Sequence, residues 1–292
     1  MKVFPPRAAT KEELSRVHAP SYIAEVLDEH RCYEWQGQRK DLSTLAALFA
    51  GGTLVALDKL LNEGFKTAIH FPGAKHHAQF DHSSGFCVFA DFALAADIAS
   101  KEYGLKVAIY DFDGHHGDGT ENLTLENDKV LTVSVHQKGI FPGTGNVSIP
   151  EKLAYNVPLV PKTTPWDDGM GDDGLGRGLS EFIMKGGDFK PDLIMIAAGA
   201  DGFKDDPLTG LTYTKEGIVD QGTTLRRFFP KTKILVGGAG GYLPDTATPD
   251  IWASYAVRIA VEHGWNEFKE KPPKKLSEVL MKNLGFRDIE TK

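Results

Sequence analysis

The sequence predicts a three-layer α/β/α protein in which a mainly parallel, doubly wound sheet lies between layers of helices. Short apolar runs alternate with stretches of helical periodicity along the 292 residues, which is the pattern of repeated strand–helix units. The composition, 41% hydrophobic and 25% charged, is that of a globular protein. Glycine-rich or reactive residues follow the apolar runs, and ligands of such sheets bind beyond the carboxyl ends of the strands.

Each expected strand is a short apolar run, and each expected helix is a longer stretch with apolar residues three or four positions apart. The strands are expected at residues 67–71, 106–111, 130–136, 193–198 and 233–237. The helices are expected at residues 45–61, 92–103, 217–228 and 248–262, with a further helix around 179–184. Because the chain contains no internal repeat and no low-complexity linker, we predict a single domain over residues 1–292.

The second expected strand leads into the most informative segment, residues 110–119, which read YDFDGHHGDG. In an extended strand, side chains two positions apart point the same way, so Asp111, Asp113 and His115 are expected on one face. Carboxylates and an imidazole on one face are typical of a metal site. The alternative is a glycine-rich acidic turn with solvated histidines.

The fourth expected strand is followed by Gly-Ala-Asp at residues 199–201. Together, Asp113, His115 and Asp201 predict a three-ligand metal site with room for water and substrate. That open position is what a hydrolytic metal requires. The alternative for Asp201 is a turn residue that caps a loop.

Two adjacent histidines, His76 and His77, follow the first expected strand. A histidine can take a proton from water and return it to a leaving amine. Such histidines need carboxylates that fix their orientation, and Asp111 and Asp118 are the candidates. The alternative is a pair of solvent-exposed histidines.

Three aromatic residues occur near glycines at the same set of strand ends. Tyr242 follows four small residues, and its hydroxyl could stabilise a developing oxyanion. Phe86 and Phe141 could form an apolar slot for a long substrate stem. The alternatives are a tyrosine packed at a loop edge and two core phenylalanines.

Charge and cysteine content restrict the function classes. The net charge of −7 argues against nucleic acid as a direct ligand, but it does not exclude a cationic substrate. Two cysteines, Cys32 and Cys87, do not provide a disulfide framework or metal-site spacing. We expect no membrane association and a cytoplasmic protein, because no apolar run of spanning length and no signal-peptide core were found.

The ordered motifs resemble those of the histone deacetylase family, which includes acetylpolyamine amidohydrolases and acetoin-utilisation proteins. The resemblance extends from about residue 5 to residue 258. The shared motifs are HHA at 76–78, GFC at 85–87, DxDxHHGDG at 111–119, FPGTG at 141–145, GAD at 199–201 with DP at 206–207, and GGY at 240–242.

The resemblance implies the arginase–deacetylase fold and a single deacetylase-like catalytic domain. It assigns Asp113, His115 and Asp201 as zinc ligands, although Fe²⁺, Co²⁺ or Mn²⁺ would also suit this donor set. Asp111 and Ser134 match positions that help to hold a structural potassium ion in relatives.

The resemblance also implies roles for the residues around the metal. His77 would act as general base and acid with support from Asp118, while His76 would be its electrostatic partner, held by Asp111. Tyr242 would hydrogen-bond the substrate carbonyl and the tetrahedral intermediate. The substrate would lie against Phe86, Phe141, Gly85 and Gly240.

Some features depart from the family pattern. Ala90 stands where an asparagine is common, a feature of class IV deacetylases, some of which remove long acyl chains. Ala239 replaces a usual glycine, and the loop between His136 and Phe141 is short. The strand, loop and helix that normally precede the segment from Pro5 are missing, so we expect a more open site or one covered by a partner. An exposed sheet edge would also allow a homodimer.

The sequence therefore predicts a metal-dependent amidohydrolase that removes an acyl group, expected to be acetyl, from an acylated lysine, polyamine or small metabolite. One alternative is a ureohydrolase-like enzyme with two Mn ions, but Phe203 stands where its second aspartate would be. Others are a deacylase for longer chains and a non-catalytic acyl-amine binding module. The acidic residues 166–168 and 172–173 are interpreted as a solvated loop rather than a surface that attracts cations.

Overall fold

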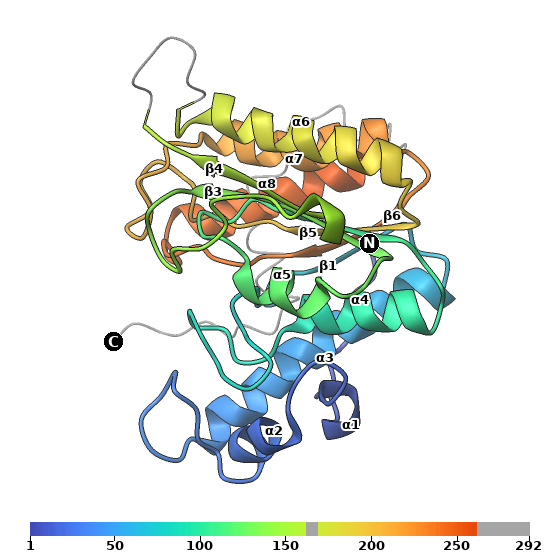
Figure 1. Ribbon diagram of the computed structural model, residues 1–292, viewed down its shortest axis with the longest axis vertical. Helices are drawn as coiled ribbons and strands as arrows, with labels where there is room; N and C mark the ends of the chain where they lie inside the picture. The colour runs from blue at the N-terminus through green and yellow to red at the C-terminus, as the bar shows by residue number, and fades with distance from the viewer. Residues whose placement is uncertain (162–168, 262–292) are drawn as a thin grey trace.

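The computed structural model describes residues 1–161 and 169–261. Within them, six strands form one sheet in the order β1-β6-β5-β2-β3-β4, and every neighbouring pair is parallel (Figure 1). The strands are β1 (Thr67–His70), β2 (Val107–Asp111), β3 (Val130–Gln137), β4 (Ala154–Leu159), β5 (Leu193–Ala197) and β6 (Lys233–Gly237). The predicted parallel sheet is confirmed.

Helices cover both faces of the sheet, which confirms the three-layer prediction (Figure 1). One layer contains α6 (Asp172–Phe189), α7 (Lys215–Phe228) and α8 (Ala247–Val261). The other contains α3 (Lys40–Asn62), α4 (Asp91–Lys101) and α5 (Asp118–Thr124), with the short helices α1 (Lys11–Leu14) and α2 (Pro20–Leu27) packed below α3. A single 3₁₀ turn, η1 (Pro150–Lys152), precedes β4.

Two apolar cores lie on opposite faces of the sheet, because successive strand residues point to opposite sides. Ile109 belongs to the core under α3 and α4, whereas its neighbour Tyr110 belongs to the core under α6 to α8. Both residues are at most 1% exposed. Strand β2 therefore lies in the middle of the molecule, and the residues that follow it emerge at a fixed place on the sheet edge.

Strand β4 was not predicted from the sequence. Its six residues read AYNVPL, and the asparagine and proline are both unfavourable in a strand interior. The structure places β4 at the edge of the sheet, where only one side must hydrogen-bond, so Pro158 is tolerated.

Residues 172–173 are exposed, as expected, but their interpretation as part of a loop was wrong. Asp172 and Asp173 form the first turn of α6, where carboxylates suit the helix dipole. Asp172 accepts hydrogen bonds from the backbone N–H of Thr214 (2.8 Å) and from its hydroxyl (2.6 Å), which ties α6 to α7. Residues 166–168 of the same acidic stretch lie outside the described residues.

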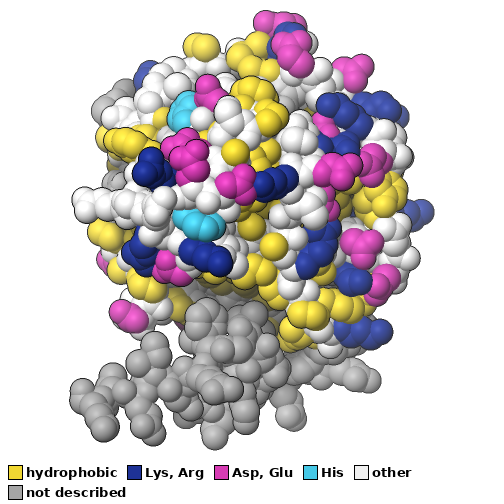
Figure 2. Space-filling view, turned by 90° about the horizontal axis from the view of Figure 1, so that it is seen from below, with side chains coloured by type: hydrophobic (Ala, Val, Ile, Leu, Met, Phe, Trp, Pro, Cys, Tyr) yellow, Lys and Arg dark blue, Asp and Glu magenta, His cyan; other side chains and the backbone are white. Residues whose placement is uncertain are grey.

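Helix α3 is longer and more apolar than expected. It extends over 23 residues and contains an 18-residue apolar window with a mean hydropathy of 1.5, so length and composition alone would let it cross a membrane, contrary to the sequence analysis. Half of this apolar window is buried, and α3 packs against α4 and β1, as a core helix does. The face of the molecule that carries α1 to α3 shows side chains of both charges interspersed with apolar ones (Figure 2).

Candidate active site

The sheet register brings the polar motifs together. Asp111 at the end of β2 is level with Ser134 of β3 on one side and with Ala197 of β5 on the other. Ala197 is in turn level with Gly237 of β6. The segments that follow β2, β5 and β6 therefore leave the sheet side by side, as expected for a site at the carboxyl ends of parallel strands.

Asp113, His115 and Asp201 form a buried cluster, as the sequence analysis expected. One ligand atom from each residue lies within 4.8 Å of the other two. Nδ1 of His115 is 2.8 Å from Oδ2 of Asp201 and 3.2 Å from Oδ1 of Asp113. Both carboxylates are at most 1% exposed, so the cluster is isolated from bulk water.

Backbone N–H groups hold the two carboxylates in place. Gly114 donates to Oδ1 of Asp201 (2.8 Å), and His115 donates to Oδ1 of Asp113 (2.9 Å). Gly240, from the loop after β6, donates to Oδ2 of Asp113 (2.6 Å). A Cβ atom at Gly240 would lie 2.7 Å from that oxygen and 2.9 Å from Oδ2 of Asp201, so the space beside the carboxylates requires glycine.

The cluster concentrates negative charge in a dry environment. Burial and the charge of Asp113 raise the pKa of Asp201 to about 7. Burial also disfavours the charged form of Asp113, but the charges of His76 and His115 outweigh it and lower its pKa. Burial lowers the pKa of His115, but its hydrogen bonds to the two carboxylates outweigh this and raise it to about 10. Two carboxylates at this distance favour a cation between them, so the donor set and its charge fit a divalent metal.

Each of the two adjacent histidines contacts its own carboxylate, in the pairing that the sequence analysis expected. Nδ1 of His76 is 2.7 Å from Oδ2 of Asp111, and Nδ1 of His77 is 2.7 Å from Oδ1 of Asp118. Both residues are 4% exposed, so the alternative of solvent-exposed histidines is wrong. With Nδ1 bound to a carboxylate, Nε2 is the nitrogen available to exchange a proton.

The electrostatic environments of the two histidines differ. Burial lowers the pKa of His76, but the charges of Asp111 and Asp113 outweigh it and raise the pKa to about 9. Burial and the charge of His76 lower the pKa of His77 to about 4. The two adjacent imidazoles therefore differ in charge preference, with the neutral form favoured at His77 and the cationic form at His76.

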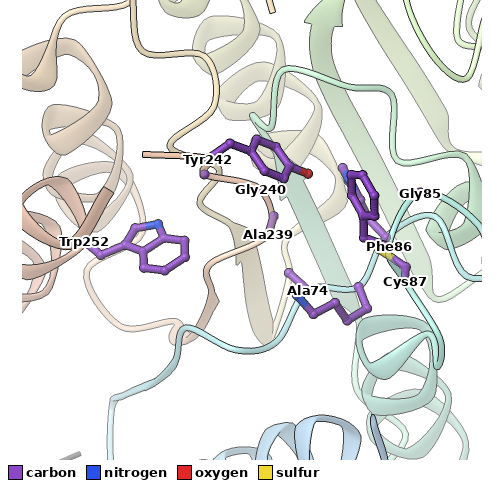
Figure 3. Close-up of a pocket in the computed structure, with 11 residues that line it drawn as sticks. Ala74, Gly85, Phe86, Cys87, Ala239, Gly240, Tyr242 and Trp252 are labelled. Atoms are coloured by element: carbon purple, nitrogen blue, oxygen red, sulfur yellow. The ribbon is translucent and has the colours of Figure 1, made fainter. Parts of the chain in front are cut away.

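Tyr242 borders a cavity of about 250 Å³ and points across it toward Phe86 (Figure 3). The rings of the two residues are 6.0 Å apart. The backbone N–H of Tyr242 donates to Oδ2 of Asp206 (2.8 Å), which positions the loop after β6. Burial raises the pKa of Tyr242, so its hydroxyl stays a hydrogen-bond donor. The cavity is lined by Ala74, Lys75, His76, Gly85, Phe86, Cys87, Ala239, Gly240, Gly241, Tyr242 and Trp252.

The two phenylalanines are exposed rather than part of the core. Phe86 is 67% exposed and Phe141 is 49% exposed. The ring of Phe141 lies 4.9 Å from that of His77 and 6.4 Å from that of His115, so it borders the cluster. A Cβ atom at Gly85 would collide with the imidazole of His77, so glycine is required there as well. The alternative of two core phenylalanines is therefore wrong, and the apolar slot stays a prediction.

Ser134 and Asp111 lie in adjacent strands, as the potassium prediction requires. Oγ of Ser134 is 2.9 Å from Nδ1 of His136, and Oδ1 of Asp111 accepts from the backbone N–H of Asp113 (3.0 Å). The monovalent cation site stays a prediction.

The sequence analysis gave no role to three residues beside the site. Gln79 donates to Oδ2 of Asp118 (2.9 Å) and so supports His77 indirectly. Glu34 accepts from the backbone N–H of Phe86 (3.1 Å). Lys75 lines the cavity. Lys75 directly precedes the histidine pair in the sequence, and this position could have identified it as a site residue. Glu34 lies in a segment without a motif, so nothing in the sequence indicated its place beside the site.

Comparisons with known proteins agree with this geometry. The model of the histone deacetylase domain matches residues 1–258. The acetoin utilization protein AcuC of Staphylococcus aureus (strain COL) is 30% identical over 275 residues, which cover 86% of this chain and 69% of the relative. Histone deacetylase 8 of Xenopus tropicalis is 32% identical over 273 residues, which cover 85% of this chain and 70% of that relative. The crystal structure of the HDA15 HD domain superimposes with a TM-score of 0.75 at 27% identity, covering 89% of this chain and 77% of that one.

Proposed function

Because this chain belongs to the histone deacetylase family, whose members are hydrolases of amide bonds, we propose that it is a metal-dependent deacetylase of acylated primary amines. The observation that carries this proposal is the buried cluster of Asp113, His115 and Asp201 beside two buried histidines, each held by its own carboxylate. Lysine side chains, polyamines and small metabolites with an acylated amine are the candidate substrates.

The three clustered residues would hold the metal. A bound divalent cation would polarise the substrate carbonyl and make water a better nucleophile. Zinc is the metal that we propose, and the two carboxylates also suit Fe²⁺, Co²⁺ or Mn²⁺. A second ion, as in ureohydrolases, would need a ligand at position 203, which is phenylalanine. The potassium ion at Asp111 and Ser134 is part of the same proposal.

The remaining residues supply proton transfer and charge stabilisation. His77, neutral and held by Asp118, would take the proton of the attacking water and pass it to the leaving amine. His76, cationic and held by Asp111, would stabilise the negative charge that develops. The Tyr242 hydroxyl would donate a hydrogen bond to the carbonyl oxygen as it gains charge. A non-catalytic binding module would not need all of these groups.

The test measures the hydrolysis of a panel of four acylated amines at equal concentration. Each is assayed once with added Zn²⁺ and once with a chelator. The panel contains an acetyl-lysine peptide, a long-chain acyl-lysine peptide, acetylspermidine and acetylputrescine. We expect turnover of at least one member that the chelator abolishes. Absence of turnover of every member by protein with metal bound would contradict the proposal.

Metal content gives a separate readout. We expect Asp201→Asn to lose bound metal, measured by mass spectrometry of the purified protein, because a ligand is replaced by a weaker one. The matched control is Asp205→Asn, since Asp205 is exposed and close in sequence. Equal metal content in the two variants would contradict the assignment of Asp201.

A further inference from the structure

A second cavity adjoins the one beside Tyr242. It has a volume of about 200 Å³ and lies between the first half of α3 and the segment after Gly85. Its lining is mostly apolar and includes Trp35, Leu45, Phe49 and Phe86, with Glu34 and Lys75 as its charged members. Lys75 and Phe86 line both cavities, so Lys75 stands where the two spaces meet.

The backbone around Lys75 is firmly held. Its N–H donates to Oδ1 of Asp91 (2.7 Å), and the N–H of Ala74 donates to Oδ2 of the same carboxylate (2.9 Å). Asp91 is fully buried and also accepts from the hydroxyl of Thr53. The lysine is therefore held in its position by the loop rather than by its own side chain.

The Lys75 ammonium has no carboxylate within 4.0 Å among residues 1–161 and 169–261. Nζ lies 5.6 Å from the ring centroid of Phe49, which keeps it at the border of the second cavity. Burial raises the pKa of the Cys87 thiol to about 12, and the charge of Lys75 opposes that rise, so the ammonium also acts on the first cavity. Lys75 is partly buried, and its ammonium is therefore available to an anionic ligand that enters the first cavity.

The acyl end of the substrate would face this ammonium. In the function proposed above, the carbonyl lies between the metal cluster and Tyr242, and the amine stem leaves between the exposed rings of Phe86 and Phe141. The acyl group must then extend the other way, toward the buried residues Ala74 and Cys87. Lys75 lines the same cavity as Ala74 and Cys87.

Resting on that proposed function, we infer that the enzyme is selective for short acyl groups that end in a carboxylate, such as succinyl or glutaryl, with Lys75 as the residue that binds the carboxylate. Pockets for drug-sized ligands have volumes of about 300–1,000 Å³, so a cavity of about 250 Å³ suits a group of a few carbons. The reaction adds water across the amide C–N bond and releases the amine and a dicarboxylate, so no other reactant is needed.

Hydrolysis of matched peptides tests this inference. One lysine peptide is prepared with succinyl, with succinamoyl (the uncharged amide of the same size), with acetyl and with a long-chain acyl group. We expect kcat/KM for succinyl to exceed that for succinamoyl roughly tenfold to a hundredfold, as for a hydrogen bond to a charged group. Lys75→Met should remove most of this ratio, and Lys75→Arg should retain part of it. The control is Lys231→Met, at an exposed lysine on the turn before β6.

Equilibrium binding provides a readout besides turnover. In a Tyr242→Phe background, fluorescence anisotropy should show that the succinyl peptide binds more tightly than the succinamoyl peptide, and that Lys75→Met removes the difference. A succinyl-to-succinamoyl ratio near one, or a ratio that survives Lys75→Met, would overturn the inference. So would preference for the long-chain peptide, which would assign the second cavity to an apolar chain. Because acetyl turnover is measured in parallel, loss of all activity would contradict the proposed function instead.

Discussion

The backbone N–H of Gly240 donates a hydrogen bond to Oδ2 of Asp113 over 2.6 Å, although the two residues are 127 positions apart in the chain. This bond joins the loop after β6 to the loop after β2, and it directs one carboxylate oxygen of the candidate metal site. The same glycine leaves the space beside Asp113 and Asp201 free of side-chain atoms. A small residue in one strand-end loop therefore determines the shape of a site built mainly from others.

We predict that Gly240→Ala weakens metal binding and lowers kcat/KM by about 10- to 100-fold, the range seen when partners of metal ligands are altered. The new Cβ would lie 2.7 Å from Oδ2 of Asp113, so the loop or the carboxylate must move. Metal affinity from competition with a chelator would measure this. The control is Gly187→Ala, in α6, where a Cβ meets nothing within 4 Å. Equal effects of the two substitutions would contradict the steric argument.

Replacement of Tyr242 by phenylalanine removes only the hydroxyl. If that hydroxyl stabilises the developing oxyanion, kcat should fall by about 100- to 1,000-fold with little change in KM. Steady-state kinetics on the preferred substrate separates the two parameters. Tyr103→Phe is the matched control, because Tyr103 is exposed on the surface. A raised KM with unchanged kcat would assign Tyr242 to substrate binding alone.

The Asp118→Asn variant tests how His77 is held. Asparagine keeps the shape of the side chain but loses the charge that accepts from Nδ1 of His77 over 2.7 Å. We predict a decrease in kcat of about 10- to 100-fold, because the imidazole loses its preferred tautomer and basicity. The bound metal should be retained, unlike in Asp201→Asn. If kcat of Asp118→Asn matches that of Asp205→Asn, the role of Asp118 is disproved.

Away from the site, His18 makes the stability of the fold depend on pH. Its Nε2 accepts from the backbone N–H of Ala90 (2.9 Å), and its Nδ1 lies 2.8 Å from the carbonyl oxygen of Gln79. This arrangement requires the neutral imidazole, and burial lowers the pKa of His18 from 6.5 to about 4. Between these pH values the unfolded chain binds more protons than the folded one, so stability is lost as the pH falls.

For His18→Gln, we predict that the loss of unfolding free energy between about pH 7.5 and about pH 5 is smaller than in the wild type by about 2 kcal/mol. Glutamine does not titrate but retains an acceptor and a donor. Urea denaturation at the two pH values measures the difference. His82→Gln is the control, since the side chain of His82 is 62% exposed. An identical pH dependence in wild type and His18→Gln would exclude this role for His18.

Five of the six strands were predicted from the sequence, because each is a short apolar run with glycine or polar residues after it. Strand β4 could not be predicted, because Pro158 is acceptable only at the edge of a sheet. Which strand lies at the edge depends on the strand order, and local sequence does not specify that order. The starts of α3 and α6 were placed too late for a similar reason. Their first turns are polar, and Asp172 shows its role only through its contact with Thr214 of another element.

The sequence by itself determined which residues are the candidates for the chemistry. Asp113, His115 and Asp201, with the histidine pair, follow strands in motifs whose residue types suit metal binding and proton transfer. Only the tertiary structure decided how they differ from one another. The opposite pKa shifts of His76 and His77 arise from burial and from charges that the sheet register brings near. The position of Lys75 between two cavities depends likewise on the packing of α3 against the loop after β1. Electrostatic environment depends on distance in space, and adjacent residues in the sequence can therefore acquire different roles.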